Sequence, residues 1–264
     1  MIPAGRMPVL FIGHGSPMNA IEDNEFSQAW QAAAAALPKP KAILCISAHW
    51  ESYGTKVTMA AKPSTIHDFG GFPKALFDVQ YPAPGSPELA EEIIRLVATT
   101  TVSPDAEWGL DHGCWSVVKH LYPDADVPVV QLSIDYRKTP AQHLALAKEL
   151  AVLRDQNILI IGSGNLVHNL RTIAWDRMQP ESEPFDWASE ANEGMKKRIL
   201  DFDLEGFSSM TSLGKAYQLA IPTPEHFLPI LYVLGAASAD ETINLFNDSY
   251  VGGSLSMTSV SIGL

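Results

Sequence analysis

The chain has 264 residues, of which 46% are hydrophobic and 18% are charged, so it carries enough apolar material for a folded core and disorder is excluded. Its 18 Lys and Arg stand against 30 Asp and Glu, and the resulting formal net charge of −12 argues against nucleic acid and anionic membranes as partners. The N-terminal segment Met1–Pro8 lacks the apolar core of a signal peptide, and the longest apolar stretch, Phe227–Ala239, is too short to span a bilayer. Two cysteines, Cys45 and Cys114, are too few for a disulfide framework, so we expect a cytoplasmic protein.

Short apolar runs alternate with segments of helical pattern along the chain. The runs that read as strands are Val9–Ile12, Ala42–Ile46, Val127–Leu132, Ile158–Ile161 and Leu255–Ile262. The segments that read as helices are Glu25–Leu37, Pro87–Ala98, Pro140–Arg154, Trp187–Phe202 and Pro224–Leu234. Ser86 and Thr223 each precede a proline, which predicts a hydroxyl N-cap followed by proline at the first helical position. The alternation predicts an α/β fold in a single domain, residues 1–264, in which the helical region 187–217 could cover the sheet.

Three histidines follow predicted strands: His14 in Gly13–Pro17, His49 in Ser47–Trp50, and His168 after Gly162-Ser163-Gly164. The carboxyl ends of the strands of an open α/β sheet form a ligand crevice, so these side chains can converge there. One histidine at a strand end is most often a packing residue, but three at equivalent ends favour a shared metal site. A fourth, His226, lies beside Glu225 near the start of a predicted helix. No compact metal motif such as His-Glu-x-x-His accompanies them.

Two further segments carry polar and aromatic side chains in predicted loops. Asp111 and His112 could bind a polar aromatic ligand, although the local pattern favours Asp111 as a helix cap. The stretch Thr65–Pro73 is rich in glycine and aromatic residues, which suits a mobile lid or a pocket wall as well as a packed surface loop. The remaining helical histidines, His120 and His143, are expected to face solvent or to hydrogen-bond locally.

Taken together, these motifs resemble the class III extradiol ring-cleavage dioxygenases of the LigB type, and within them the 4,5-DOPA extradiol dioxygenases. The similarity covers nearly the whole chain and rests on Gly13–Pro17, Ser47–Trp50, Asp68–Pro73, Gly109–Gly113, Ser163–Asn165, His168–Leu170 and Glu225–Phe227. It implies a single α/β domain with a central twisted mixed sheet flanked by helices and a metal site at the carboxyl ends of its strands. It further implies cleavage of a catechol, such as L-DOPA or a related compound, by O2 at a non-haem Fe(II) site to give a muconate semialdehyde.

The resemblance also implies roles for individual residues. His14 and His49 are metal ligands and His226 is a third, although Glu225 is an alternative because related protocatechuate-cleaving enzymes use a glutamate. His168 is either a fourth ligand or the acid/base, and His112 orients the substrate or the oxygen. Asp68, Phe69 and Asp111 are the candidates for substrate contact. A site built from histidines also suits zinc, so Zn(II) is plausible in purified protein.

Two other functions remain open at this point. The same histidines could hold a zinc-activated water in a hydrolase, or the chain could be a metal-binding relative without catalysis. The sequence leaves the physiological catechol, the native metal and the oligomeric state undetermined.

Overall fold

The computed structural model of the chain describes residues 6–179, 182–209 and 213–264. Residues 1–5 of the N-terminal segment Met1–Pro8 lie outside the described residues. So do residues 210–212 of the helical region 187–217 that was expected to cover the sheet. At the centre is a six-stranded sheet in the order β6-β2-β8-β1-β12-β9. Its strands are β1 (Val9–Gly13), β2 (Ala42–Ser47), β6 (Val129–Gln131), β8 (Ile158–Gly164), β9 (Ile243–Phe246) and β12 (Ser259–Ile262). The first four strands in this order are parallel, whereas β12 runs antiparallel to β1 and to β9, so the sheet is mixed as expected.

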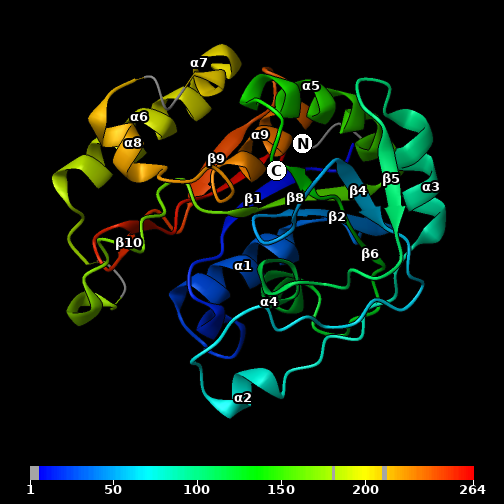
Figure 1. Cartoon of the computed structure of the whole chain (residues 1–264), viewed down its shortest axis with the longest axis horizontal. Coiled ribbons are helices and arrows are strands. Elements are labelled where there is room, and N and C mark those ends of the chain that lie inside the picture. The colour runs from blue at the N-terminus through cyan, green and yellow to red at the C-terminus, as the bar shows by residue number, and fades with distance from the viewer. Residues whose placement is uncertain (1–5, 180–181, 210–212) are drawn as a thin grey trace.

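Both faces of the sheet are covered by helices, which explains why its central strands are continuous apolar runs (Figure 1). On one face, α9 (Leu228–Ala236) lies against the strands and α5 (Pro140–Leu150) packs on it. On the other face lie α4 (His112–Leu121) and α1 (Glu25–Ala36). Successive β1 residues alternate between the two cores: Phe11 belongs to the first and Leu10 to the second.

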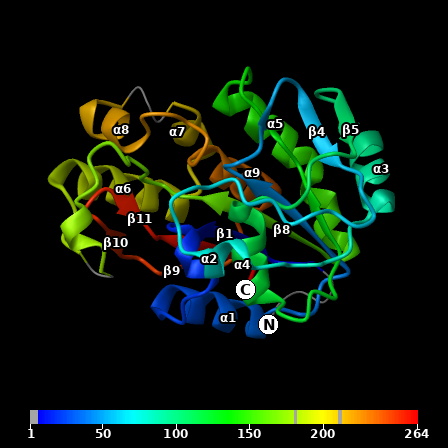
Figure 2. The ribbon, with the colours of Figure 1, turned by 60° about the horizontal axis from the view of Figure 1, so that its bottom comes forward.

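The remaining elements surround this frame. The helices are α2 (Lys74–Phe77), α3 (Pro87–Leu96), α6 (Asp186–Leu200), α7 (Leu204–Ser208) and α8 (Lys215–Ala220), with 3-10 turns at Pro17–Ala20, Ala151–Gln156 and Trp175–Arg177. Three two-stranded sheets are formed by β3 (Glu51–Ser52) with β7 (Ile134–Asp135), β4 (Thr55–Thr58) with β5 (Val102–Asp105), and β10 (Tyr250–Val251) with β11 (Leu255–Ser256). The described helices of the predicted covering region, α6 to α8, pack into the same core as α9, beside β10 and β11 (Figure 2). Among the described residues, no helix has the length and apolarity that a membrane crossing requires.

The structure corrects the sequence-based boundaries near the C-terminus. The helix expected over Pro224–Leu234 begins only at Leu228, because residues 225–227 form a turn in which the N–H groups of Phe227 and Leu228 both reach the Pro224 carbonyl. Thr223 is therefore not an N-cap, and its hydroxyl donates to Glu225 instead. The strand expected over Leu255–Ile262 is broken into β11 and β12, since its two halves pair with different partners, β10 and β1.

Candidate metal and catalytic site

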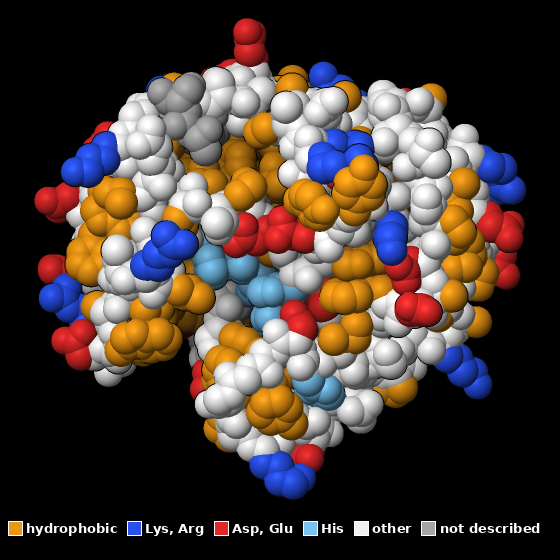
Figure 3. Space-filling view, viewed as in Figure 1, with side chains coloured by type: hydrophobic (Ala, Val, Ile, Leu, Met, Phe, Trp, Pro, Cys, Tyr) orange, Lys and Arg blue, Asp and Glu red, His pale blue; other side chains and the backbone are white. Residues whose placement is uncertain are grey.

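Five histidines from separate elements gather at the carboxyl ends of β1, β2 and β8. His14 directly follows β1, His49 follows β2, His168 follows β8, His112 is the first residue of α4, and His226 lies in the turn before α9. The space-filling view shows histidine side chains at the bottom of a hollow, with acidic side chains beside them (Figure 3). The predicted convergence of His14, His49 and His168 from distant strand ends is therefore present in the fold.

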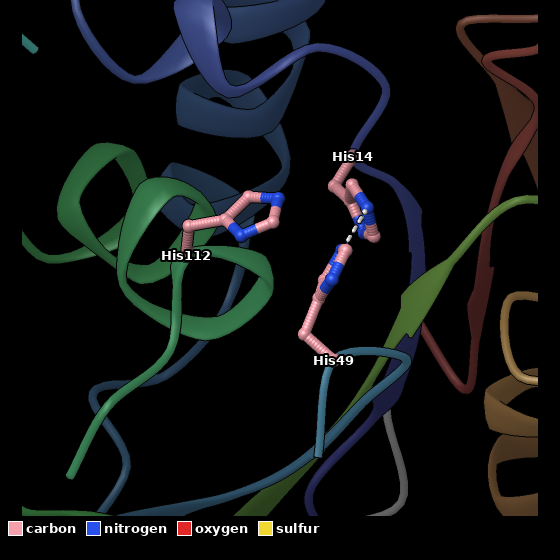
Figure 4. Close-up of side chains that lie close together, drawn as sticks. All are labelled: His14, His49 and His112. Carbon is pink, nitrogen blue, oxygen red and sulfur yellow. Dashed lines mark hydrogen bonds between the residues drawn. The ribbon is translucent and has the colours of Figure 1, made fainter. Parts of the chain in front are cut away.

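The rings of His14, His49 and His226 form a nearly equilateral triangle. Their centroids are 5.0 Å apart for His14 and His49, 5.3 Å for His14 and His226, and 5.0 Å for His49 and His226. Three imidazoles bound to one ion through nitrogen at about 2.1 Å, at angles near 100°, would place their centroids about 5 Å apart. The Nε2 atoms of His14 and His49 are 3.1 Å from each other, close to the separation of about 3 Å expected for two such ligands at right angles (Figure 4). These three side chains fit a divalent metal ion.

Hydrogen-bond partners at Nδ1 turn the other nitrogen of three rings toward this space. The Nδ1 atom of His14 is 3.0 Å from the Ser163 hydroxyl, and that of His226 is 3.2 Å from a Glu225 carboxylate oxygen. The Nδ1 atom of His112 is 2.9 Å from Asp68. A carboxylate or hydroxyl at the outer nitrogen is the usual support of a histidine that binds metal through the inner one.

Burial keeps the imidazoles of His14, His49 and His226 neutral. It lowers the pKa of His14 and of His226 well below the usual value of 6.5, and the neighbouring histidines lower both pKa values further. Burial and His112 likewise lower the pKa of His49 to about 3, although Asp68 opposes the shift. Because only the neutral ring can bind a cation, the group meets the electrostatic condition for a metal site.

The nitrogen atoms of the histidines group differently from the centroids of their rings. Potential ligand atoms lie within 4.8 Å of one another in His14, His49 and His112, and separately in His168, Glu225 and His226. The rings of His49 and His112, however, have centroids only 3.8 Å apart, which is closer than two ligands of one ion at right angles would be. The centroid spacings of 5.0 and 5.3 Å from His226 to its two neighbours therefore favour His226 over His112 as the third member of the set.

His168 stacks on His226. The two rings are nearly parallel, at 5°, with centroids 3.5 Å apart. Parallel rings in face-to-face contact do not direct nitrogens at a common ion, so the arrangement favours an acid/base role for His168 over the fourth-ligand alternative. Burial lowers the pKa of His168 to about 4, against an opposing effect of Glu225.

Two of the three residues predicted to contact substrate lie on the aromatic loop, Thr65–Pro73. The side chain of Asp68 is 19% exposed and is held by His112, through its backbone N–H and through Nδ1. The ring of Phe69 meets the ring of His112 edge-on, with centroids 5.4 Å apart. The loop is fixed to α4 by a bond of 2.8 Å from the Trp115 indole N–H to the Ile66 carbonyl.

The third predicted contact residue, Asp111, is fully buried and is the N-cap of α4, with its side chain accepting from the Cys114 N–H. Its carboxylate also accepts from the Ser47 hydroxyl at 2.6 Å and from the Gln131 amide at 2.6 Å. With both oxygens occupied away from solvent, Asp111 positions α4, and with it His112, without reaching a substrate. The sequence analysis assigned no role to Gln131 or Ser163. Each is a polar residue in or beside an apolar run, and that pattern could have marked it as a candidate.

The two histidines expected to face solvent or to bond locally differ from that expectation. His143 is fully buried on α5 and pairs at 2.8 Å with the hydroxyl of Tyr232 on α9. His120 is half-buried and lies 2.7 Å from the Asn19 carbonyl. Both are interior contacts between elements remote in sequence, and neither belongs to the histidine cluster.

Comparison with known proteins decides the family. Residues 8–261 match the family described as the catalytic LigB subunit of aromatic ring-opening dioxygenase. The chain belongs to the LigB family. It is 49% identical over 261 residues to a 4,5-DOPA dioxygenase extradiol of Escherichia coli (strain K12), covering 98% of this chain and 95% of the relative. It is 38% identical over 255 residues to a Beta vulgaris protein of the same name, covering 93% and 92%.

A solved structure shows that the likeness extends to the fold. The crystal structure of an uncharacterized protein from Escherichia coli K12 superposes with a TM-score of 0.84 at 44% sequence identity, covering 97% of this chain and 100% of the other. These matches confirm the resemblance noted in the sequence, the α/β fold class, and the enzyme class, an extradiol ring-cleavage dioxygenase.

Proposed function

We propose that this LigB-family chain opens the ring of a catechol beside one of its hydroxyl groups, using O2 and a metal ion held by His14, His49 and His226. The single observation that carries the ligand assignment is the triangle of rings with sides of 5.0, 5.3 and 5.0 Å. Three ligands on one side of an ion leave its other side open for substrate, as in non-haem Fe(II) oxygenases. We further propose L-DOPA or a related catechol as substrate, since two relatives carry that compound in their names.

The metal proposed for activity is Fe(II), and the ring-opened product is a muconate semialdehyde. When bound, Fe(II) supplies the redox chemistry that lets O2 react with a catechol, which Zn(II) cannot supply. Zn(II) suits the same imidazoles, and we expect it to occupy purified protein without supporting turnover.

The chain's own residues bind and orient the catechol. His168, stacked against His226 and neutral because it is buried, is placed to take a proton from a catechol hydroxyl. His112 presents its Nε2 atom from the start of α4 and orients the substrate. Phe69 offers a ring edge beside His112, which suits packing against an aromatic substrate and exclusion of water.

The test begins with metal analysis of freshly purified protein, followed by oxygen-electrode measurements with a series of catechols. Metal-free protein reconstituted with Fe(II) should consume O2 and form a yellow product, whereas protein reconstituted with Zn(II) should do neither. Turnover of an ester or amide by the zinc form under anaerobic conditions would instead show a hydrolase. Absence of both reactions would leave a metal-binding protein and overturn the proposal.

The third ligand is tested by three alanine substitutions measured for metal content. His226→Ala should abolish metal loading, whereas His112→Ala and Glu225→Ala should retain it. Full iron content in the His226 variant would remove that side chain from the ligand set, and loss of metal from either of the other two would assign the position to it.

A further inference from the structure

We propose that Asp68 is a positioning residue that fixes the tautomer of His112, so that the lone pair of Nε2 faces the substrate. This inference rests on the proposed function for the identity of the substrate. The hydrogen bonds from which it is argued belong to the chain itself and are independent of any metal.

The Asp68 carboxylate uses its two oxygens for two different donors of the same residue. Oδ1 accepts the backbone N–H of His112 at 2.9 Å, and Oδ2 accepts from Nδ1 of the His112 ring at 2.9 Å. Oδ2 also lies 3.6 Å from Nδ1 of His49, beyond hydrogen-bond distance. The first bond satisfies a free N–H in the first turn of α4. The second bond joins the same carboxylate to the side chain of the same residue. Rotation of the carboxylate would therefore break both hydrogen bonds.

This pairing determines which nitrogen of the His112 ring carries the proton when the ring has only one. At the alkaline pH of the test below, a carboxylate is ionised and can only accept hydrogen bonds. Nδ1 must therefore be the protonated nitrogen, which leaves an unprotonated Nε2. The ring projects from α4 toward His14 and His49 (Figure 4), so this lone pair points into the site, where it can accept a bond from a catechol hydroxyl.

The aromatic loop gives Asp68 its fixed place. Phe69, the next residue, packs edge-on against the same His112 ring, and Trp115 donates its indole N–H to the Ile66 carbonyl. Loop and helix are thus joined on both sides of Asp68. The loop therefore affects the protonation of His112 through the Asp68 side chain.

An isosteric substitution separates positioning from structure. In Asp68→Asn, the amide oxygen must still face the backbone N–H of His112, so the amide NH2 turns toward Nδ1. That group donates and cannot accept, which makes Nδ1 the acceptor and moves the ring proton to Nε2. The shape of the site is kept, but a proton replaces the lone pair that faces the substrate. This change of tautomer is expected when a carboxylate that orients a histidine is replaced by an amide.

The first measurement is 15N NMR of the full-length, metal-free chain labelled at histidine, at alkaline pH where imidazoles are neutral. The His112 signals are identified by their absence from His112→Ala. The parent chain should show protonated Nδ1, and Asp68→Asn should show protonated Nε2. The matched control is Asp78→Asn, which removes an exposed carboxylate paired with Lys74 in the same segment and should leave the tautomer unchanged. Protonated Nδ1 in both the parent and Asp68→Asn would overturn the proposal.

The second measurement is a double-mutant cycle with iron-loaded protein. Asp68→Asn should lower kcat by about 100-fold or more with little change in KM, and Asp68→Glu should recover part of the loss. In the His112→Ala background, Asp68→Asn should cost nothing further, because its effect passes through that ring. Fully additive losses, or a rise in KM alone, would overturn the proposal, because Asp68 would then act outside the His112 ring, through His49 or the substrate. If the parent chain opens no catechol, the proposed function fails, and the NMR result still decides the role of Asp68.

Discussion

The hydroxyl of Ser163 lies 3.0 Å from Nδ1 of His14 and donates its only proton to the Gly113 carbonyl at 2.6 Å. Toward His14 it can therefore act only as an acceptor, so Nδ1 of His14 is protonated and its Nε2 carries a lone pair. A serine on β8 thus sets the tautomer of the histidine that follows the neighbouring strand β1, which is the tautomer that the proposed metal binding requires.

Ser163→Ala should weaken metal binding by about 10- to 100-fold, because the His14 tautomer and ring orientation lose their support. Competition against a chromogenic zinc chelator measures the affinity. The exposed Ser103→Ala on β5 serves as the control and should bind as tightly as the parent chain. Unchanged affinity in the Ser163 variant would show that the triangle of rings is held without this bond.

His168→Ala should retain metal and lose at least about 100-fold in kcat, because in the proposed mechanism the stacked ring supplies proton transfer and no ligand atom. Metal content and catechol turnover are measured on the same preparation. His120→Gln, outside the cluster, is the control for replacement of a half-buried histidine. Loss of metal together with activity would place His168 among the ligands.

Gly113→Ala should displace His49 without abolishing the fold. A Cβ atom at this position would lie 2.4 Å from the Ser47 hydroxyl and 2.8 Å from Cδ2 of His49, so one of them must move. Catechol turnover and metal affinity should fall together, with a smaller decrease in the unfolding temperature. Gly70→Ala is the control, since its Cβ meets nothing within 4 Å. Full activity in the Gly113 variant would mean that His49 tolerates the shift.

The sequence predicted those parts of the site that follow from topology. His14, His49 and His168 each follow a buried strand within a few residues, and parallel strands bring such positions to one edge of the sheet. His226 was recognised as well, but on the wrong element, because Thr223 and Pro224 have the pattern of a helix start while the chain turns there once more before α9. A local pattern cannot distinguish a helix start from a turn that precedes one.

The supporting contacts could not be predicted in the same way. The bonds of Asp68 to His112 and of Ser163 to His14 join residues remote in sequence, and their geometry depends on packing. Asp111 illustrates the difference between local and long-range contacts. The sequence predicted its role as a helix cap but not the hydrogen bonds that it accepts from Gln131 and Ser47. The paired strands β4 and β5 were missed because each is short, and β5 includes a proline.

The burial of His143, which lies outside the histidine cluster, predicts that the free energy of unfolding depends on pH. Burial and Lys138 lower its folded-state pKa from 6.5 to about 4. As the pH falls from 6.5 toward 4, the unfolded chain takes up a proton at this position that the folded chain does not, so stability decreases by up to about 3 kcal/mol. Above 6.5 both states are neutral there and the effect vanishes.

His143→Asn keeps a polar partner for Tyr232 and removes the titrating group, so its unfolding free energy should fall less steeply over this range than that of the parent chain. Urea unfolding at a series of pH values measures the difference. Equal slopes for the two proteins would show that His143 does not contribute to acid sensitivity.

The three proposed ligands, His14, His49 and His226, lie on segments that meet only in the folded chain, so a cation bound to all three would couple its occupancy to global unfolding. An ion held by all three binds the native state and has little hold on the unfolded chain, so the midpoint of thermal denaturation should rise with the free concentration of the ion. Heat denaturation can then serve as a titration of the site, even for variants that no longer turn over a catechol.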